Sequence, residues 1–267
     1  MIAALGMYDR AEAQSANDHL WALIRDGMRG RGLAAPEGLT RGAGAYWDAW
    51  QAPDLILSQT CGYPFRARLH DRVTLIGTPD YGVAGCPPGH YCSVLVARAD
   101  DPRAALAAFD GAALAFNDDL SQSGWAAPQT HASALGITLP PRLRTGGHLL
   151  SACAVVEGRA EIAAIDAVTW DMIARWDTIA RRLKVVGRTG PSPGLPYIAA
   201  LGTDAALMFA IVADAIAALP GRDRDTLRLK GLTRIEPAAY LAVPTPPTPV
   251  ELGMTAARPD PDVQKAH

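Results

Sequence analysis

The stretch Asn117-Asp118-Asp119-Leu120-Ser121-Gln122-Ser123-Gly124 separates two segments of different character. The apolar run 112–116 before it is typical of a buried strand, and residues 125–135 after it are typical of a helix. Ser121 and Ser123 are therefore expected in a strand-to-helix turn, at or beside the N-cap. The first N–H groups of a helix have no intrahelical partner and carry partial positive charge. Such a turn can bind an oxyanion, although most of them only cap a helix.

Strands and helices alternate on the N-terminal side of this turn. This alternation predicts an α/β fold with a mainly parallel sheet, in which ligands bind at the carboxyl ends of the strands. The expected strands are 1–7, 39–45, 54–60, 73–77 and 91–98, and the expected helices are 16–29, 46–50 and 63–69.

A second α/β unit begins near residues 99–102, and the chain of 267 residues has the length of two lobes. From Gly187 the chain is expected to return to the first unit. Residues 244–249 contain four prolines and should be extended, and the chain beyond Ala256 should be a polar tail. The remaining expected strands are 112–116, 142–146, 162–165, 183–186 and 198–201, and the remaining expected helices are 104–109, 125–135, 149–157, 168–176, 203–219 and 223–229.

The composition excludes several classes of protein. The chain is 49% hydrophobic and 19% charged, which excludes a disordered protein. Its net charge of −2 gives no basic surface for nucleic acid. No apolar run has transmembrane length, and no signal peptide is visible at the N-terminus. We therefore expect a soluble protein that is cytoplasmic, or periplasmic if an export signal has been removed.

The cysteines and histidines do not predict a metal site. The four cysteines are Cys61, Cys86, Cys92 and Cys153, without CxxC spacing, and the six histidines are scattered. We expect neither a metal nor a cofactor. Cys61 and Cys86 both lie in glycine-rich turns, so they could form a disulfide in an oxidising compartment or remain two reduced thiols.

Polar side chains gather at the ends of predicted strands and at the starts of predicted helices. Each has a structural alternative: Tyr8 and Tyr63 as core aromatics, His148 as a structural histidine, and Asp166 as the cap of the next helix. We expect these groups to line one cleft. The predicted ligand-binding residues are Tyr8, Thr60, Tyr63, Tyr91, Ser121, Gln122, Ser123, His148 and Asp166.

A catalytic role for the same residues is the weaker interpretation. Ser121, His148 and Asp166 could form a hydrolytic triad, but the serine is not in a Gly-x-Ser-x-Gly elbow. The chain has no Walker loop, and no GxGxxG follows its first strand. We therefore expect the protein not to be an enzyme.

Six motifs occur in an order that is similar to one known family. They are Ala4-Leu5-Gly6-Met7-Tyr8, Gln59-Thr60-Cys61-Gly62-Tyr63-Pro64, Gly85-Cys86 with Tyr91, Ser121-Gln122-Ser123-Gly124, Thr145-Gly146-Gly147-His148 with Ser151, and Ala163-Ala164-Ile165-Asp166. Together, over about residues 2–200, they resemble the PhnD-like phosphate, phosphite and phosphonate substrate-binding proteins of ABC transporters.

The resemblance implies a type II periplasmic-binding-protein fold. Its two lobes would be residues 1–96 with 188–267 and residues 97–187, joined by crossover strands near 94–98 and 185–189. The ligand would be trapped in the cleft between the lobes by hinge closure.

The resemblance also implies roles for particular residues. Ser121 and Ser123 match the Ser-x-Ser that holds phosphonate oxygens, His148 matches a further oxygen donor, and Tyr91 matches a cleft tyrosine. Asp166 matches an acidic residue that accepts from a ligand amine or a protonated oxygen. Gly147 departs from the family pattern, because a serine usually precedes the histidine.

The resemblance predicts a monomeric solute-binding protein that captures a small oxyanion such as phosphate, phosphite or a phosphonate for ABC-type import. Its partners would be this ligand and an ABC transporter permease, without nucleic acid. The alternative is a cytoplasmic sensor or metabolite-binding protein that has the same fold and a different ligand.

Overall fold

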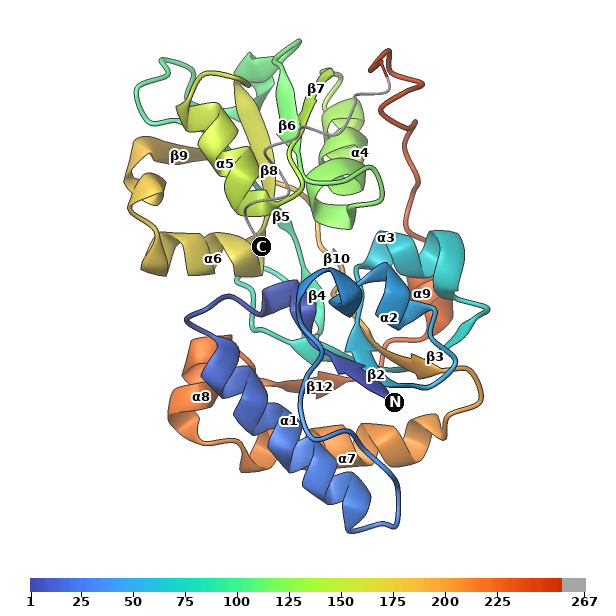
Figure 1. The fold of residues 1–267 in the computed structure, drawn as a ribbon. Helices are drawn as coiled ribbons and strands as arrows, with labels where there is room; N and C mark the ends of the chain where they lie inside the picture. Colours follow the sequence, from blue (N-terminus) through green and yellow to red (C-terminus); the bar gives the residue numbers. More distant parts are fainter. Residues whose placement is uncertain (256–267) are drawn as a thin grey trace. The chain divides into compact units, whose positions relative to one another are not determined.

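The computed structural model describes residues 1–255, and the chain divides into two compact units (Figure 1). Unit 1 consists of Met1–His90 and Pro193–Ala242. Unit 2 consists of Tyr91–Ser192 and the described residues from Val243 onward. The predicted polar tail beyond Ala256 lies outside the described residues.

Unit 1 is built on a mixed five-stranded sheet with the order β1-β2-β11-β3-β12. β1 and β2 are parallel, whereas β11 is antiparallel to both β2 and β3, and β12 is antiparallel to β3. The predicted mainly parallel sheet is therefore wrong, because the returning strand β11 is inserted between two strands of the first segment. The strands are β1 (Ile2–Ala4), β2 (Leu55–Gln59), β3 (Val73–Asp80), β11 (Tyr197–Ala200) and β12 (Gly231–Thr233).

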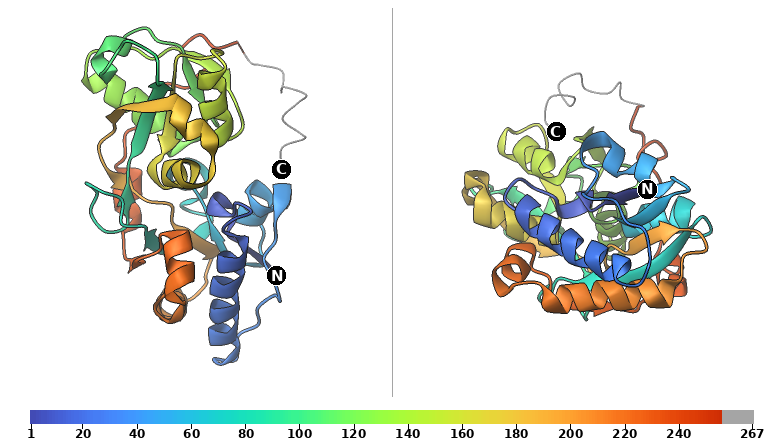
Figure 2. Two further views of the ribbon diagram at one scale, coloured as in Figure 1. Left: turned by 90° about the vertical axis from the view of Figure 1, so that its left-hand side faces the viewer. Right: turned by 60° about the horizontal axis from the view of Figure 1, so that its bottom comes forward.

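Helices of unit 1 bury apolar side chains against this sheet. α1 packs beside α7 and α8, and α7 contacts β3 and β12 (Figures 1 and 2). A separate core cluster joins Trp50, Phe65 and Tyr240 from three short segments with strand residues such as Ile198. The helices are α1 (Gln14–Arg29), α2 (Trp47–Trp50), α3 (Gly62–Pro64), α7 (Ala205–Ala218), α8 (Gly221–Leu227) and α9 (Pro237–Leu241), with 3-10 helices η1 (Gly6–Tyr8) and η2 (Gly42–Ala45) and the π-helical turn η3 (Phe65–Leu69).

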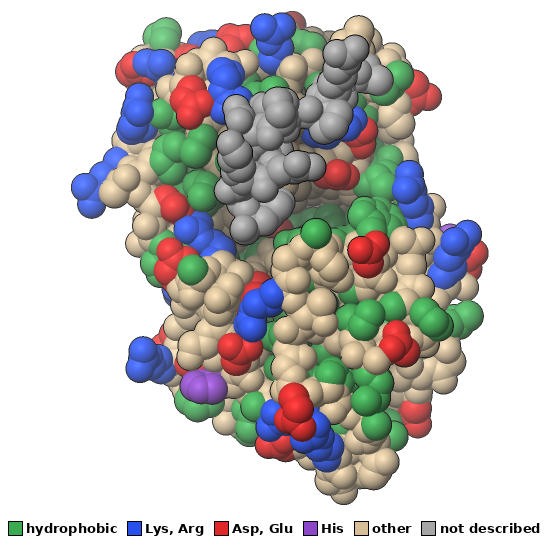
Figure 3. Space-filling view, in the orientation of Figure 1, with side chains coloured by type: hydrophobic (Ala, Val, Ile, Leu, Met, Phe, Trp, Pro, Cys, Tyr) green, Lys and Arg blue, Asp and Glu red, His purple; other side chains and the backbone are tan. Residues whose placement is uncertain are grey.

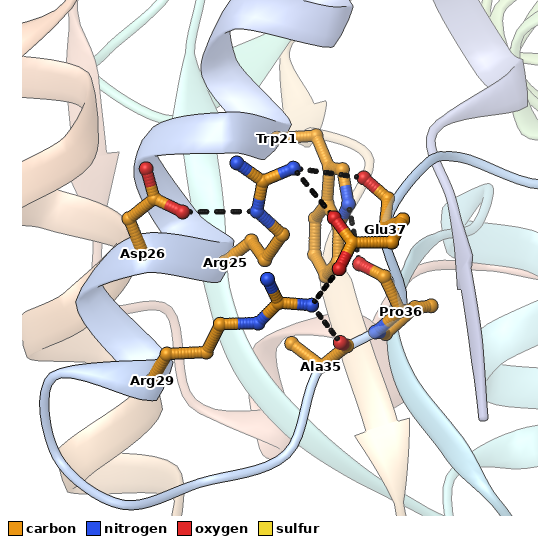
Figure 4. A network of polar contacts seen from close by, with 7 residues as sticks. All are labelled: Trp21, Arg25, Asp26, Arg29, Ala35, Pro36 and Glu37. Carbon is orange, nitrogen blue, oxygen red and sulfur yellow. Dashed lines mark hydrogen bonds and ion pairs between the residues drawn. The ribbon is translucent and has the colours of Figure 1, made fainter.

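Side chains of α1 hold the segment that follows it (Figure 4). The indole Nε1 of buried Trp21 donates to the carbonyl of Pro36 at 3.2 Å. Arg25 and Arg29 both donate to the carboxylate of Glu37, at 3.3 and 2.7 Å. These hydrogen bonds fix a segment that has no regular secondary structure of its own.

Unit 2 contains a second mixed five-stranded sheet, with the order β7-β6-β8-β5-β9. β6 is parallel to β7 and β8, and β5 is antiparallel to β8 and β9. The strands are β5 (Ser93–Arg98), β6 (Leu114–Phe116), β7 (Pro141–Arg144), β8 (Ile162–Asp166) and β9 (Leu183–Arg188); the helices are α4 (Ala127–Ala134), α5 (His148–Val156) and α6 (Ala167–Trp176), with η4 (Leu106–Phe109), π-helical η5 (Gln122–Ala126) and η6 (Thr178–Arg182).

The chain passes between the units within two short strands, β4 (His90–Tyr91) and β10 (Ser192–Pro193), which form a two-stranded sheet. The expected crossovers at 94–98 and 185–189 instead belong to β5 and β9 in the sheet of unit 2. The chain crosses between the units a third time after Ala242, where it passes from unit 1 back to unit 2. The expected lobes therefore differ from the units in residues 91–96, 188–192 and the segment after Ala242.

Most predicted elements are present, and one is wrong. A strand is predicted at residues 39–45, but residues 42–45 form η2, and the backbone N–H of Thr40 donates to the Ala3 carbonyl of the edge strand at 2.7 Å without extending the sheet. Gly42 has a positive φ of 71°, which an extended strand does not contain. No disulfide joins any two of the four cysteines, all of which lie within the described residues.

Within residues 1–255, no single helix has both the length and the apolar character needed to cross a membrane. Among these residues, α7 and α8 taken together have sufficient length and apolar character, but the two helices meet at a bend of 111°.

We predict that Tyr240→Phe destabilises the protein. The Tyr240 hydroxyl lies 2.5 Å from Thr78 Oγ1 and donates to the Gly194 carbonyl at 3.0 Å, with both side chains buried. Removing it leaves two buried groups without this partner, so the free energy of unfolding should fall by about 1–3 kcal/mol. Urea denaturation measures this change, and a loss below about 0.5 kcal/mol, the level of an ordinary surface substitution, would contradict the assignment.

Candidate ligand-binding site

The serine turn of unit 2 begins as the sequence predicts. Ser121 is the N-cap of η5, and its Oγ accepts from the backbone N–H of Gly124 at 2.9 Å. The cap uses Oγ as an acceptor, so the hydroxyl hydrogen of Ser121 can still be donated to a ligand. The helical segment continues through η5 into α4, and the turn itself is buried.

Ser123 connects three parts of unit 2. Its Oγ lies 3.0 Å from Nε2 of His148, the first residue of α5. Its backbone carbonyl accepts from Oγ of Ser93 in β5 at 2.8 Å. Ser93 is paired in register with Asp166 of β8, so this contact also places the turn beside the end of that strand.

Burial favours the neutral form of His148 at neutral pH, in which one ring nitrogen carries a hydrogen and the other does not. Burial lowers the pKa of His148 to about 4, and the backbone of Ala164 opposes this shift more weakly. The Ala164 backbone is near enough to favour the protonated ring, but within residues 1–255 no group meets the buried Nδ1 with the distance and angle of a hydrogen bond. α5 begins at this histidine without a side-chain cap, because its N-cap is Gly147. Gly147 thus leaves the start of α5 without the hydroxyl that the family pattern supplies.

Asn117, the first residue after β6, lies against Gly124. Its Oδ1 is buried and has no hydrogen-bond partner among the described residues. A Cβ added to Gly124 would be 1.9 Å from this oxygen and 3.1 Å from Oγ of Ser121. A side chain at position 124 would therefore force the Asn117 amide and the Ser121 hydroxyl to move.

One ion pair lies beside the turn. Arg144 at the end of β7 donates to both carboxylate oxygens of Asp119, with an Nε to Oδ1 distance of 2.8 Å. This bidentate contact offsets a negative charge close to the serines. On the face shown in Figure 3, basic and acidic side chains are interspersed and do not form one basic patch.

Two other groups of unit 2 have structural roles. Oδ1 of Asp166 accepts from the N–H groups of Val168 and Thr169, at 2.7 and 3.0 Å, so the aspartate caps α6. Thr145 Oγ1 and Ser151 Oγ are 2.7 Å apart, and both also contact the Gly147 carbonyl. The hydroxyls of the Thr145–Ser151 pair are therefore satisfied within the protein.

In unit 1, Thr60 is the distinctive predicted residue. It follows β2, its side chain is fully buried, and its Oγ1 has no hydrogen-bond partner among residues 1–255. Tyr8 is buried at the end of η1 and packs edge-on against Tyr81, with ring centroids 5.0 Å apart. Tyr63 is buried under the guanidinium of Arg66, whose carbon lies 4.1 Å from the ring centroid.

Residues that were not predicted lie around Tyr8. Nε2 of Gln59 donates to the Tyr81 hydroxyl at 3.0 Å and to the Leu195 carbonyl at 3.1 Å. A hollow of about 10 Å³, barely large enough for one water, is bordered by Gln59, Tyr81, Tyr8 and Tyr197. The position of Gln59 directly before Thr60 at the end of β2 was the available sequence signal.

The structure thus groups the predicted residues by unit. Ser121, Gln122 and Ser123 form one turn, to which His148 is hydrogen-bonded and beside which Asp166 ends β8. Tyr8, Thr60 and Tyr63 belong to unit 1. Tyr91 is buried in β4, and Gln122 is buried in the turn.

The large hollows lie elsewhere. One of about 470 Å³ runs along α4 and residues 245–252, and another of about 500 Å³ lies at the surface of unit 1 near Trp47 and Arg68. Neither is lined by a predicted ligand-binding residue or by one of the three unpartnered atoms described above.

The sequence matches a family model described as "ABC transporter, phosphonate, periplasmic substrate-binding protein" over residues 50–240. Comparison with curated protein sequences gives no match.

Three solved structures illustrate the likeness in fold. XAC2383 from Xanthomonas citri, bound to chloride ion, is 17% identical with a TM-score of 0.68, covering 94% of this chain and 96% of that chain. PhnD1 from Prochlorococcus marinus (MIT 9301), in complex with methylphosphonate, is 15% identical with a TM-score of 0.63, covering 85% and 90%. PA3383 from Pseudomonas aeruginosa, a binding protein component of an ABC phosphonate transporter, is 16% identical with a TM-score of 0.59, covering 86% and 79%. At these identities the likeness shows the fold, and it confirms the α/β periplasmic-binding-protein class.

We predict a pH dependence of stability that originates at His148. Its pKa is lowered from 6.5 to about 4 in the folded state, so between these values the unfolded state binds more protons. The free energy of unfolding should therefore be highest above pH 6.5 and fall as the pH is lowered toward 4, by up to about 3 kcal/mol. Urea denaturation at several pH values should show a smaller slope for His148→Gln than for the wild type. Exposed His70→Gln is the control, and equal slopes for His148→Gln and the wild type would contradict the prediction.

We also predict that Gly124→Ala distorts the serine turn through Asn117. Because the new Cβ would meet Oδ1 at 1.9 Å, the variant should lose about 1–3 kcal/mol of stability, as overpacked sites do. Asn117→Ala in the same chain removes this oxygen, and the double variant should recover part of the loss. A double-mutant cycle by thermal denaturation measures the coupling, and strictly additive effects would contradict a direct clash.

Proposed function

Because this chain belongs to the family of phosphonate-type periplasmic substrate-binding proteins of ABC transporters, we propose that it captures a small tetrahedral oxyanion such as phosphate, phosphite or a phosphonate. The observation that supports this ligand class best is the location of unpartnered buried atoms. Among residues 1–255, the buried side-chain atoms without a hydrogen bond are Thr60 Oγ1, Asn117 Oδ1 and His148 Nδ1.

The position of these atoms favours a ligand role. A buried polar atom without a partner costs about 1–3 kcal/mol, so each needs an explanation. All three lie directly after a strand or at the first residue of a helix, in clusters that the sequence had already singled out. The Thr60 hydroxyl can donate to a ligand oxygen and Nδ1 of His148 can donate or accept, whereas Oδ1 of Asn117 is an acceptor and would contact a protonated ligand group.

The proposed donors are mainly neutral. Ser121 and Ser123 lie at the start of a helical segment, and the uncapped start of α5 adds backbone N–H groups beside His148. Such an arrangement binds an anion through local dipoles. We propose that Tyr8, Tyr63 and Tyr91 complete the contacts and that Gln122 supports the turn. A protonated ligand oxygen would donate to Asp166.

We propose that no covalent bond is made in this site. Ser123 and His148 resemble the first two members of a hydrolytic triad, but a triad base is oriented by a carboxylate on its second nitrogen. Nδ1 of His148 has no such partner among the described residues. Asp166, the predicted third member, uses Oδ1 to cap α6.

The family is a transport family, so the proposed partner is an ABC permease and the proposed compartment is the periplasm. We propose that the protein acts as a monomer. The position of the ligand in an interlobe cleft that closes by a hinge remains a prediction of the family resemblance.

We predict that Thr60→Val separates binding from stability. Valine has nearly the same shape but lacks the unpartnered hydroxyl, so the ligand-free protein should be as stable as the wild type or more stable. Its affinity for the ligand should fall about tenfold, as expected for the loss of a hydrogen bond to a charged group. Calorimetry with phosphate, phosphite, methylphosphonate and 2-aminoethylphosphonate measures the affinity, and thermal denaturation measures the stability.

The matched control is Thr78→Val in the same unit. Thr78 is equally buried, but its hydroxyl already contacts Tyr240. This variant should be destabilised and should keep the wild-type affinity. For the wild type, a ligand at 100 times its dissociation constant should stabilise the fold by about 2.7 kcal/mol. If none of the four anions stabilises it, the oxyanion proposal is wrong for these ligands.

A further inference from the structure

The C-terminal segment of the described chain, residues 243–255, lies on unit 2 although it follows α9 of unit 1. We name these residues the C-terminal strap. The family model ends at residue 240, so the strap lies outside the matched part of the chain. Residues 244–248 have no regular secondary structure, as the prolines predicted.

The strap makes a specific contact with the serine turn. The indole Nε1 of Trp125 donates to the carbonyl of Pro247 at 3.1 Å. Trp125 is the second residue after Ser123, belongs to η5 and is fully buried. Its ring also packs on Phe116, the last residue of β6, with centroids 4.9 Å apart. One side chain therefore joins the strap, the turn and the strand that precedes the turn.

The chemistry of the strap explains why a carbonyl is the group that is bound. Proline has no N–H, so a segment rich in proline offers mainly carbonyl oxygens for hydrogen bonding. Aromatic side chains that pack on and donate to extended proline-rich chains are a recurring recognition mode. The Trp125–Pro247 hydrogen bond supplies the donor part of this mode within a single chain.

Two further features hold the strap in place. Pro249 is buried, whereas most of the strap is exposed. After it the chain closes into a turn in which Glu251 accepts from the backbone N–H and the hydroxyl of Thr248, at 2.7 and 2.9 Å. The closed turn limits the freedom of the strap beyond Pro247, and this lowers the entropy lost in forming the tryptophan hydrogen bond.

We propose that the C-terminal strap positions the Ser121–Gly124 turn for ligand binding and that Trp125 is the positioning residue that connects them. This inference rests on the proposed function of the turn. The strap fixes the indole, the indole fixes η5 relative to β6, and η5 carries Ser123. Loosening the strap should therefore let the turn fluctuate and weaken binding, without removing any group proposed to touch the ligand.

The full-length chain offers a matched pair of variants. Trp125→Phe keeps an aromatic ring against Phe116 and removes the N–H donor. Trp21→Phe makes the same change in unit 1, where buried Trp21 donates to the carbonyl of Pro36 at 3.2 Å. Both variants lose a tryptophan-to-proline hydrogen bond and a similar ring volume. A general loss of stability should affect them alike, so a difference between them isolates the role of the strap.

Hydrogen exchange of the ligand-free proteins and calorimetry with methylphosphonate test the proposal. For Trp125→Phe, amides in residues 121–127 and 248–254 should exchange faster than in the wild type, and the affinity should fall about five- to tenfold, the effect of one neutral hydrogen bond. For Trp21→Phe, exchange in both segments and the affinity should equal those of the wild type.

Three results would overturn the proposal. Unchanged exchange in residues 248–254 of Trp125→Phe would show that the indole does not hold the strap. Unchanged exchange in residues 121–127 would show that the strap does not position the turn. Equal weakening of affinity in both variants would show a general effect. If the wild type binds none of the four anions, the proposed function fails separately, while the exchange measurement still tests the strap.

Discussion

Ser123 is the point at which the polar groups of unit 2 are brought together, because each polar group that leaves water there needs a partner. Its carbonyl accepts from Ser93 of β5, its hydroxyl contacts His148 of α5, and the turn is closed by Ser121. These contacts tie the turn to the sheet and to a second helix start. Asn117 also packs closely against Gly124, so a Cβ at position 124 would meet the amide oxygen of Asn117.

The same constraint separates polar groups that have hydrogen-bond partners within the protein from buried groups that retain an atom without one. Thr145, Ser151 and Asp166 satisfy one another or the helix ends beside them, whereas Thr60, Asn117 and His148 each retain a buried atom without a partner. Polar residues at strand ends thus fall into two classes that residue type alone does not distinguish. His148 shows why the difference matters, since a buried imidazole whose Nδ1 has no protein partner has a nitrogen left to contact a ligand, and no carboxylate among the described residues orients the ring as in a catalytic triad.

Much of the fold could be predicted because it depends on local patterns. The apolar spacing in residues 16–29 predicted α1, the serine turn was correctly placed between a strand and a helix, and Ser121 is its N-cap. The strand expected at 39–45 failed because apolar content there is not accompanied by sheet pairing. The mixed order of the sheets was missed because β11 and β5 pair with strands far away in sequence. Periodicity contains no information on such partners.

The sequence by itself determined the α/β class, the family and the cluster of small polar residues at strand ends, since these follow from local spacing and ordered motifs. Only the tertiary structure decided that Ser123, and not Ser121, faces His148, and that Trp125 binds the carbonyl of Pro247. It also decided that the chain changes units at two-residue strands and returns to unit 2 after Ala242. The physical reason is that these contacts join residues up to 122 positions apart, and their geometry is defined only once unit 2 has folded around them.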